Sequence, residues 1–152
     1  MAEKFKEKHN KEIMDYQITP EWRISLEQDY QHRTEDGQLV LWTTGRTILA
    51  VAFRYAKALQ KEQLLQELKA RAEANKVETF SAQTDTLALF AMLEPEDIGE
   101  GHLRLALHAF TLSEHTCLQT AYYFDKPADL PWAIQTWEAI QHTPQFDQER
   151  DQ

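Results

Sequence analysis

Histidine and cysteine side chains gather in the C-terminal half of the chain, where they could bind a metal ion. His108, His115 and Cys117 lie close in sequence, with Glu114 beside them, and these are ligand types that zinc accepts. Zinc ligands usually stand a few residues apart, however, and six residues separate His108 from His115. We therefore expect no metal ion and no other cofactor, with surface histidines and a packed Cys117.

The thiol of Cys117 is also the one side chain with histidines near enough in sequence to suggest nucleophilic catalysis. A reactive cysteine needs a helix N-terminus or a cationic cluster to lower its pKa, and Cys117 lies between Thr116 and Leu118 in a predicted strand. Signatures of serine hydrolases, phosphate loops and dinucleotide sites are absent from the sequence. The sequence therefore predicts no catalytic residue and a protein that is not an enzyme.

Pairs of carboxylates keep an enzyme or a small-ligand-binding protein open as an alternative. Glu27 and Asp29 would share one face of a strand, a spacing that suits acid–base catalysis, and Glu35 and Asp36 adjoin in a turn. Wet strand faces and turns also attract acids without any catalytic role. The enzyme hypothesis requires a pocket at which four side chains converge: Glu27, Asp29, His108 and His115.

A predicted acidic loop is the strongest candidate for a binding surface. Residues 94–101 contain four acids and no base: Glu94, Glu96, Asp97 and Glu100. Their order lacks the alternating ligands of a calcium loop, and such a cluster would steer a basic protein toward it. Trp132 falls off the apolar stripe of the last predicted helix, so we expect it to be an exposed aromatic anchor of the interface.

Composition and charge narrow the class of protein. The net charge of −9 argues against nucleic acid, because phosphate binding needs clustered Lys and Arg. A chain of 152 residues fits one domain and can bury a sizeable core. One cysteine, no apolar leader and no apolar run of membrane-spanning length predict a cytoplasmic protein with no membrane partner.

The predicted fold is organised around residues 48–53, which are apolar on both faces of a strand and should be covered on both sides. With residues 22–26 and 38–43, this strand predicts a three-stranded meander that turns at Glu35-Asp36-Gly37. The other predicted elements are a helix over 61–75, strands over 77–83, 87–93, 103–109 and 116–124, and a helix that begins at Asp129.

This order, βββ-α-ββββ-α, predicts an α+β fold with a largely antiparallel sheet of about seven strands and two amphipathic helices. Two arrangements satisfy it. One is an α/β/α sandwich with one helix on each face, and the other places both helices on one face and buries the opposite face in a dimer. The predicted organisation is a frayed helix or flexible arm over 1–20, one domain over 21–142 and a polar tail over 143–152.

Over about residues 20–142, the element order resembles that of the Mog1/PsbP-like fold, a three-layer sandwich of small binding proteins. The closing segment, Tyr122-Tyr123-Phe124 followed by Trp137, contributes to the resemblance. The resemblance implies a binding role and carries over no functional residue, because no diagnostic motif accompanies it.

We therefore expect a non-enzymatic acidic module that binds a basic partner protein as a monomer or homodimer. The first hypothesis is an immunity-type inhibitor that neutralises a toxin through the acidic loop and Trp132. The alternative is an escort that resembles secretion chaperones. An inhibitor predicts an acidic patch with an aromatic anchor, whereas an escort predicts a dimer and exposed apolar grooves.

Overall fold

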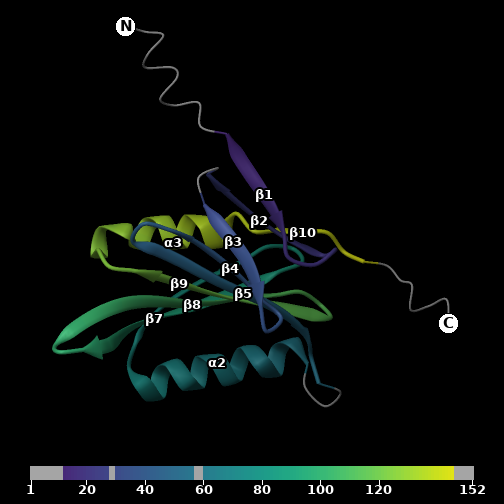
Figure 1. Ribbon diagram of the computed structural model, residues 1–152. Coiled ribbons are helices and arrows are strands. Elements are labelled where there is room, and N and C mark those ends of the chain that lie inside the picture. Colours follow the sequence, from purple (N-terminus) through teal and green to yellow (C-terminus); the bar gives the residue numbers. More distant parts are fainter. Residues whose placement is uncertain (1–11, 28–29, 57–59, 146–152) are drawn as a thin grey trace, which may run out of the picture.

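The computed structural model describes residues 12–27, 30–56 and 60–145, which adopt an α+β fold (Figure 1). Within these residues the elements are, in order, β1 (Ile13–Gln17), β2 (Trp22–Glu27), β3 (Gln31–Glu35), β4 (Gln38–Thr43), β5 (Arg46–Arg54), α2 (Lys61–Asn75), β6 (Glu78–Gln83), β7 (Ala88–Gly99), β8 (His102–Leu112), β9 (Thr116–Phe124), the 3-10 helix η1 (Pro127–Asp129), α3 (Leu130–Glu138) and β10 (Gln141–His142). No helix in this part of the chain is long and apolar enough to span a membrane.

The strands form two antiparallel sheets. The large sheet has seven strands in the order β3-β4-β5-β9-β8-β7-β6, and the small sheet has the order β1-β2-β10. Helix α2 lies against one face of the large sheet, while α3 and the small sheet lie against the other (Figure 1). The predicted fold class is confirmed, and the two helices occupy opposite faces.

Strand register determines which side chains share a face, because residues directly opposed in antiparallel strands point the same way. On the α3 side, Leu41, Ile48, Tyr122 and Leu107 stand opposite one another across β4, β5, β9 and β8. On the α2 side, the corresponding row runs from Val40 through Leu49 and Ala121 to His108 and Met92.

Two separate cores hold these layers together. The main core lies between the large sheet and the layer of α3 and the small sheet, and its largest fully buried side chains include Trp22, Ile24, Leu41, Ile48, Leu107, Leu118, Tyr122, Phe124 and Trp137. The second core lies beneath α2 and consists of Leu68, Ala72, Ala88, Phe90, Met92, Phe110, Leu112 and Cys117.

Helix α2 has the predicted bounds because both of its ends carry local signals. The Gln60 backbone N–H donates to Oε1 of Gln63 at 3.1 Å, which satisfies a free donor of the first turn. Lys76 follows the helix in the left-handed region with φ 55°, and the Val77 N–H donates to the Ala72 carbonyl at 3.3 Å. The buried residues Leu68 and Ala72 lie on the predicted apolar stripe.

Two predictions about the N-terminal region are wrong. Residues 13–17 are strand β1, paired with β2, rather than part of a frayed or flexible arm; residues 1–11 lie outside the described residues. The first strand of the meander is β3, whose five residues are all exposed, whereas β2 belongs to the small sheet. Both β1 and β3 are strands because their backbones pair with a neighbouring strand, and almost all of their side chains are exposed. They therefore lack the alternation of apolar and polar residues by which a strand is recognised in a sequence.

The prediction of an acidic loop over residues 94–101 is also wrong, because strand β7 continues from Ala88 to Gly99. Its hairpin with β8 turns at Glu100 and Gly101, with φ of 53° and 78°, as a two-residue type I′ turn requires. Strand β6 pairs with β7 only as far as Leu93, so the rest of β7 is an edge of the sheet. An edge position tolerates Pro95, which has no backbone N–H to donate to a neighbouring strand.

Candidate functional site

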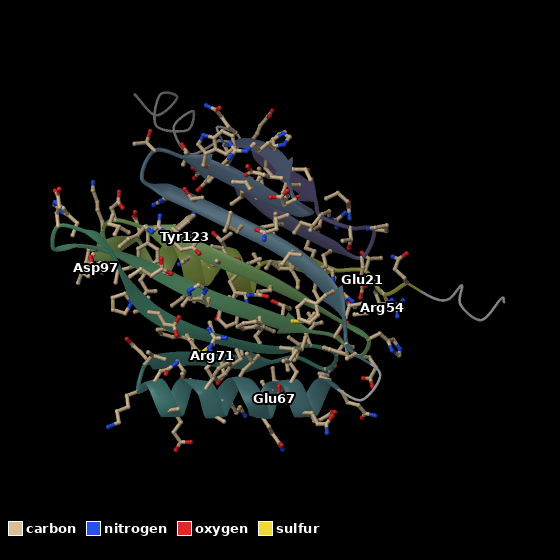
Figure 2. The ribbon with its side chains drawn as sticks, turned by 60° about the horizontal axis from the view of Figure 1, so that its bottom comes forward. Glu21, Arg54, Glu67, Arg71, Asp97 and Tyr123 are labelled. Atoms are coloured by element: carbon tan, nitrogen blue, oxygen red, sulfur yellow. The ribbon has the colours of Figure 1, made fainter. Side chains whose placement is uncertain are left out.

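The face of the large sheet that carries α2 is only partly covered by that helix. The second core takes its sheet residues mainly from β7 and β8. Seven apolar side chains on the same face belong to neither core cluster, and we call them the open face: Val40, Trp42, Leu49, Val51, Phe53, Ala121 and Tyr123. Two of them, Val40 and Ala121, are buried between their neighbours. They come from β4, β5 and β9, and Figure 2 shows this face with Tyr123 labelled above α2.

Strand β5 supplies three of the seven residues of the open face. Ile48 and Ala50 are fully buried in the main core, whereas Leu49 and Val51 point to the opposite side and are half-buried. Phe53 is 37% exposed. The prediction that both faces of this strand are covered is therefore wrong for one face, since α2 packs further along the sheet.

Charged side chains border the open face next to Tyr123. The guanidinium of Arg104 lies 4.3 Å from the centre of the Tyr123 ring and 3.2 Å from Oε1 of Glu96. Nε2 of His108 lies 3.4 Å from Oε1 of Glu94 and 3.5 Å from Oε2 of Glu96. Both carboxylates thus have basic neighbours, and this border carries charges of both signs.

The four predicted acidic residues do not form one patch. Glu94 and Glu96 lie on the border just described, while Asp97 and Glu100 are exposed near the tip of the β7–β8 hairpin. Oδ1 of Asp97 accepts a hydrogen bond from the Gly99 N–H at 2.9 Å. In Figure 2 Asp97 lies at the hairpin end of the sheet, beyond Tyr123.

Trp132 is half-buried, so the prediction of an exposed anchor is wrong. Its ring packs edge-to-face against Tyr122 and Phe124, with centroid distances of 5.9 Å and 6.3 Å. The guanidinium of Arg46 lies 4.7 Å from its ring centre. These contacts place Trp132 on the α3 side of the sheet, whereas Glu94 and Glu96 lie on the α2 side.

Arg46 also binds Asp129, the residue predicted to cap the last helix. Arg46 donates from a terminal nitrogen to Oδ1 of Asp129 at 3.0 Å, and this hydrogen bond lowers the pKa of the Asp129 carboxyl group. The structure gives Asp129 no side-chain capping hydrogen bond at the start of α3.

The Arg46–Asp129 pair predicts a pH dependence of stability. A carboxyl group whose pKa is lower in the folded state stabilises the fold above its unfolded pKa, and that contribution disappears as the pH falls through the folded pKa. When the pH is lowered from neutral to about 3, the free energy of unfolding should therefore fall less in the Asp129→Asn variant than in the natural chain. Urea titrations at a series of pH values measure this, with Asp85→Asn as the control; equal acid sensitivity of all three proteins contradicts the prediction.

A polar cleft of about 510 Å³ lies at the end of the large sheet opposite the β7–β8 hairpin, near the pairing of β10 with β2. On its floor, Oε2 of Glu21 accepts a hydrogen bond from Oγ1 of Thr116 at 2.7 Å and lies 2.7 Å from Nε2 of His142. The indole N–H of Trp22 donates to Oγ1 of Thr116 at 3.2 Å, and the Trp22 ring contacts the His142 ring. No sequence pattern marks Glu21 and His142, which are 121 positions apart.

The turn between β8 and β9 holds the cleft floor in place. The hydroxyl of Tyr55 lies 2.7 Å from the Ser113 carbonyl oxygen and 3.0 Å from that of Thr116. Burial raises the pKa of Tyr55, which keeps this hydroxyl a hydrogen-bond donor. The Ser113 hydroxyl contacts the carbonyl and Oγ1 of Thr116 at 2.9 Å and 3.1 Å.

The side chains proposed for catalysis do not converge. His115 is exposed beside the polar cleft, His108 borders the open face, and Cys117 is buried beneath α2, where burial raises its pKa to about 12. Glu27 lines a separate hollow with Arg46, and Asp29 lies outside the described residues. Glu35 pairs with Arg33 at the exposed edge of the sheet. Within the part of the chain that the structure describes, no group of three His, Cys, Asp or Glu could hold a metal ion.

Comparisons with known proteins bear on the fold alone. No protein-family model and no curated protein matches the chain. A solved structure of a protein from Bacteroides thetaiotaomicron VPI-5482 is similar, with a TM-score of 0.65 and 14% sequence identity. The match covers 84% of this chain and 48% of that one, so the chain spans about half the length of that protein. An α+β fold of this kind therefore also occurs in an experimental structure.

Proposed function

We propose that this protein is a non-enzymatic protein-binding module that escorts a basic partner by covering an apolar segment of it with the open face. The observation that carries the proposal is that Leu49, Val51 and Phe53, every second residue of β5, share one face of the sheet and lie outside both cores. A sheet face left to water normally bears polar residues, and contiguous exposed apolar surface marks an interaction site.

The shape of the open face favours a polypeptide over a small molecule. Small ligands bind in concave pockets, whereas the open face is the surface of a sheet that spans three neighbouring strands. Its aromatic members already pack under arginines, with Arg33 5.0 Å from the Trp42 ring centre and Arg104 over Tyr123. Apolar side chains framed by charged ones match the usual layout of a protein interface.

Charge supports a foreign partner rather than a second copy of the chain. Each copy carries a net charge of −9, so two copies would repel one another as they approach. A basic partner would instead be attracted over a distance of about one Debye length, roughly 8 Å at physiological salt. The sequence also predicts a basic partner. Glu94 and Glu96 of the β7–β8 hairpin and Trp132 lie on different faces of the sheet, so they cannot form one binding surface for it.

The positions of the acids and of Trp132 favour the escort over the inhibitor. An inhibitor of the predicted kind needs an acidic patch beside an aromatic anchor. Here Glu94 and Glu96 contact bases on the α2 side, and Trp132 contacts Arg46 on the α3 side. An escort needs an accessible apolar surface, and on the open face Phe53 is exposed while Leu49 and Val51 are half-buried.

The test is a double substitution on the open face that adds polarity without charge. We expect Leu49→Gln with Val51→Thr to weaken binding of the partner about thirtyfold, which corresponds to about 2 kcal/mol at an interface hot spot. The partner is captured from the native host at low salt and identified, and its dissociation constant is then measured with both proteins purified.

Ile13→Thr with Leu103→Gln is the matched control, because these side chains are 62% and 63% exposed in strands outside the open face. Both double variants must show the circular dichroism of the natural protein. Equal affinity of the natural chain and the open-face variant contradicts the proposal. Self-association of the purified protein that the open-face variant abolishes, with no partner captured, would assign the face to a second copy.

A further inference from the structure

We propose that the polar cleft binds a small zwitterion, a molecule that carries both an ammonium group and a carboxylate. The cleft lies at one end of the large sheet, between the start of β2, the end of β5, the β8–β9 turn and β10, and it extends to the start of α2 and to the β6–β7 turn. This site is separate from the open face and does not depend on the escort function.

The cleft floor offers hydrogen-bond acceptors that the fold leaves unused. Oε2 of Glu21 contacts Thr116, His142 and, at 3.4 Å, Ser113, whereas Oε1 takes part in none of the hydrogen bonds between described residues. Nε2 of His142 faces the carboxylate and donates to it, and Nδ1 of the ring takes part in no hydrogen bond in this part of the chain. An ammonium group, with three donors, suits such a floor.

The hydroxyl groups of the floor already have acceptors other than Oε1 of Glu21. Thr116 accepts a hydrogen bond from the Trp22 indole, so its single hydroxyl proton is available to Oε2 of Glu21 at 2.7 Å. The Ser113 hydroxyl is buried, and its acceptors are the Thr116 carbonyl at 2.9 Å and, at a longer 3.4 Å, Oε2 of Glu21. The remaining donor must therefore come from water or from a ligand.

The walls of the cleft carry charged side chains of both signs that do not pair with one another. Arg54 and Lys61 line the cleft with Asp85 and Glu114, and among the described residues none of these four forms an ion pair within 4.0 Å. Nζ of Lys61 makes a long contact of 3.4 Å with the Thr86 carbonyl. Figure 2 shows Arg54 and Glu21 at the same end of the molecule.

These charges select the ligand class. A purely cationic ligand would meet Arg54 and Lys61, and a purely anionic one would meet Glu21, Asp85 and Glu114. A zwitterion places its ammonium at Glu21 and His142 and its carboxylate at Arg54 and Lys61, so both charges are compensated. The volume of about 510 Å³ falls within the usual range of small-molecule sites.

The experiment compares three probes of similar length by proton–nitrogen NMR titration of the full chain. They are 6-aminohexanoate, which carries both charges, hexylamine and hexanoate. We expect 6-aminohexanoate to shift the amide signals of the 113–116 turn and of His142, with an affinity about tenfold higher than that of either singly charged probe. Equal affinities for all three probes, or no shift with any of them, would overturn the proposal.

Substitutions assign the two charges to their partners. Glu21→Gln should remove the tenfold preference for 6-aminohexanoate over hexanoate, and Arg54→Gln should remove its preference over hexylamine. Glu67→Gln is the matched control, since Glu67 is exposed on α2 (Figure 2) and should leave all affinities unchanged. Arg54→Gln also keeps the test decisive if Glu21→Gln loosens the floor, because Arg54 is exposed and takes no part in the floor's hydrogen bonds. Unchanged preferences in that variant contradict the zwitterion site.

Discussion

Trp22→Ala should lower the free energy of unfolding by about 3–5 kcal/mol, the usual cost of removing a fully buried aromatic side chain. Trp22 is 0% exposed in the main core, and its indole N–H donates to Thr116 at 3.2 Å. Its replacement leaves a cavity between the small sheet and the large one and also removes a donor from the floor of the polar cleft. Urea unfolding monitored by far-ultraviolet circular dichroism measures the change.

Two further variants separate the causes of this loss. Trp22→Phe keeps most of the ring and removes the indole donor, so we expect a smaller cost of about 1–3 kcal/mol. Trp42→Ala is the matched control, because Trp42 lies on the open face and is only half-buried; its cost should be the smallest of the three. A Trp42→Ala variant as unstable as Trp22→Ala would show that the open face is part of the folded core and not a free surface.

Cys117 should react with thiol reagents about a thousandfold more slowly than an exposed cysteine at about pH 8, because only the thiolate reacts. Burial raises its pKa from an ordinary 9.0 to about 12, which lowers the thiolate population by about that factor. Steric protection adds to this, since Cys117 is 0% exposed beneath α2. The rate should rise about tenfold for each pH step of one until the pH nears the pKa.

The chain contains one cysteine, so a chromogenic disulfide reagent reports on this site alone. Cys117→Ala with Ser81→Cys moves the thiol to an exposed position on β6 and provides the unprotected reference rate. In about 6 M guanidinium chloride the two proteins should react alike. Fast labelling of the folded natural protein would contradict the buried position and reopen the case for a reactive thiol.

The two proposed sites make separate demands on the molecule. The open face requires that β5 remain uncovered on its α2 side, and the polar cleft requires that β10 remain paired with β2. Substitutions at Leu49 and Val51 should therefore leave the zwitterion probes unaffected, and Glu21→Gln should leave the partner's affinity unaffected. Each proposal can fail without the other.

The sequence alone determined the elements whose signals are local. Helix α2 begins and ends where its apolar stripe and flanking residues place it, and β9 has its predicted bounds because β-branched and aromatic residues fill the stretch between two turns. The turn at Asp36 and Gly37 formed as predicted because positive φ favours these residue types. In each case the information lies within a few neighbouring residues.

Tertiary structure decided which faces are covered and which distant groups meet. Strand β5 is apolar on both of its faces, yet one face packs in the main core and the other belongs to the open face, because α2 packs on β7 and β8. Glu94 and Glu96 contact Arg104 and His108 only through cross-strand pairing, and Glu21 meets His142 only when β10 pairs with β2. Such contacts depend on how chain-distant elements pack, and the periodicity of a single element does not encode that packing.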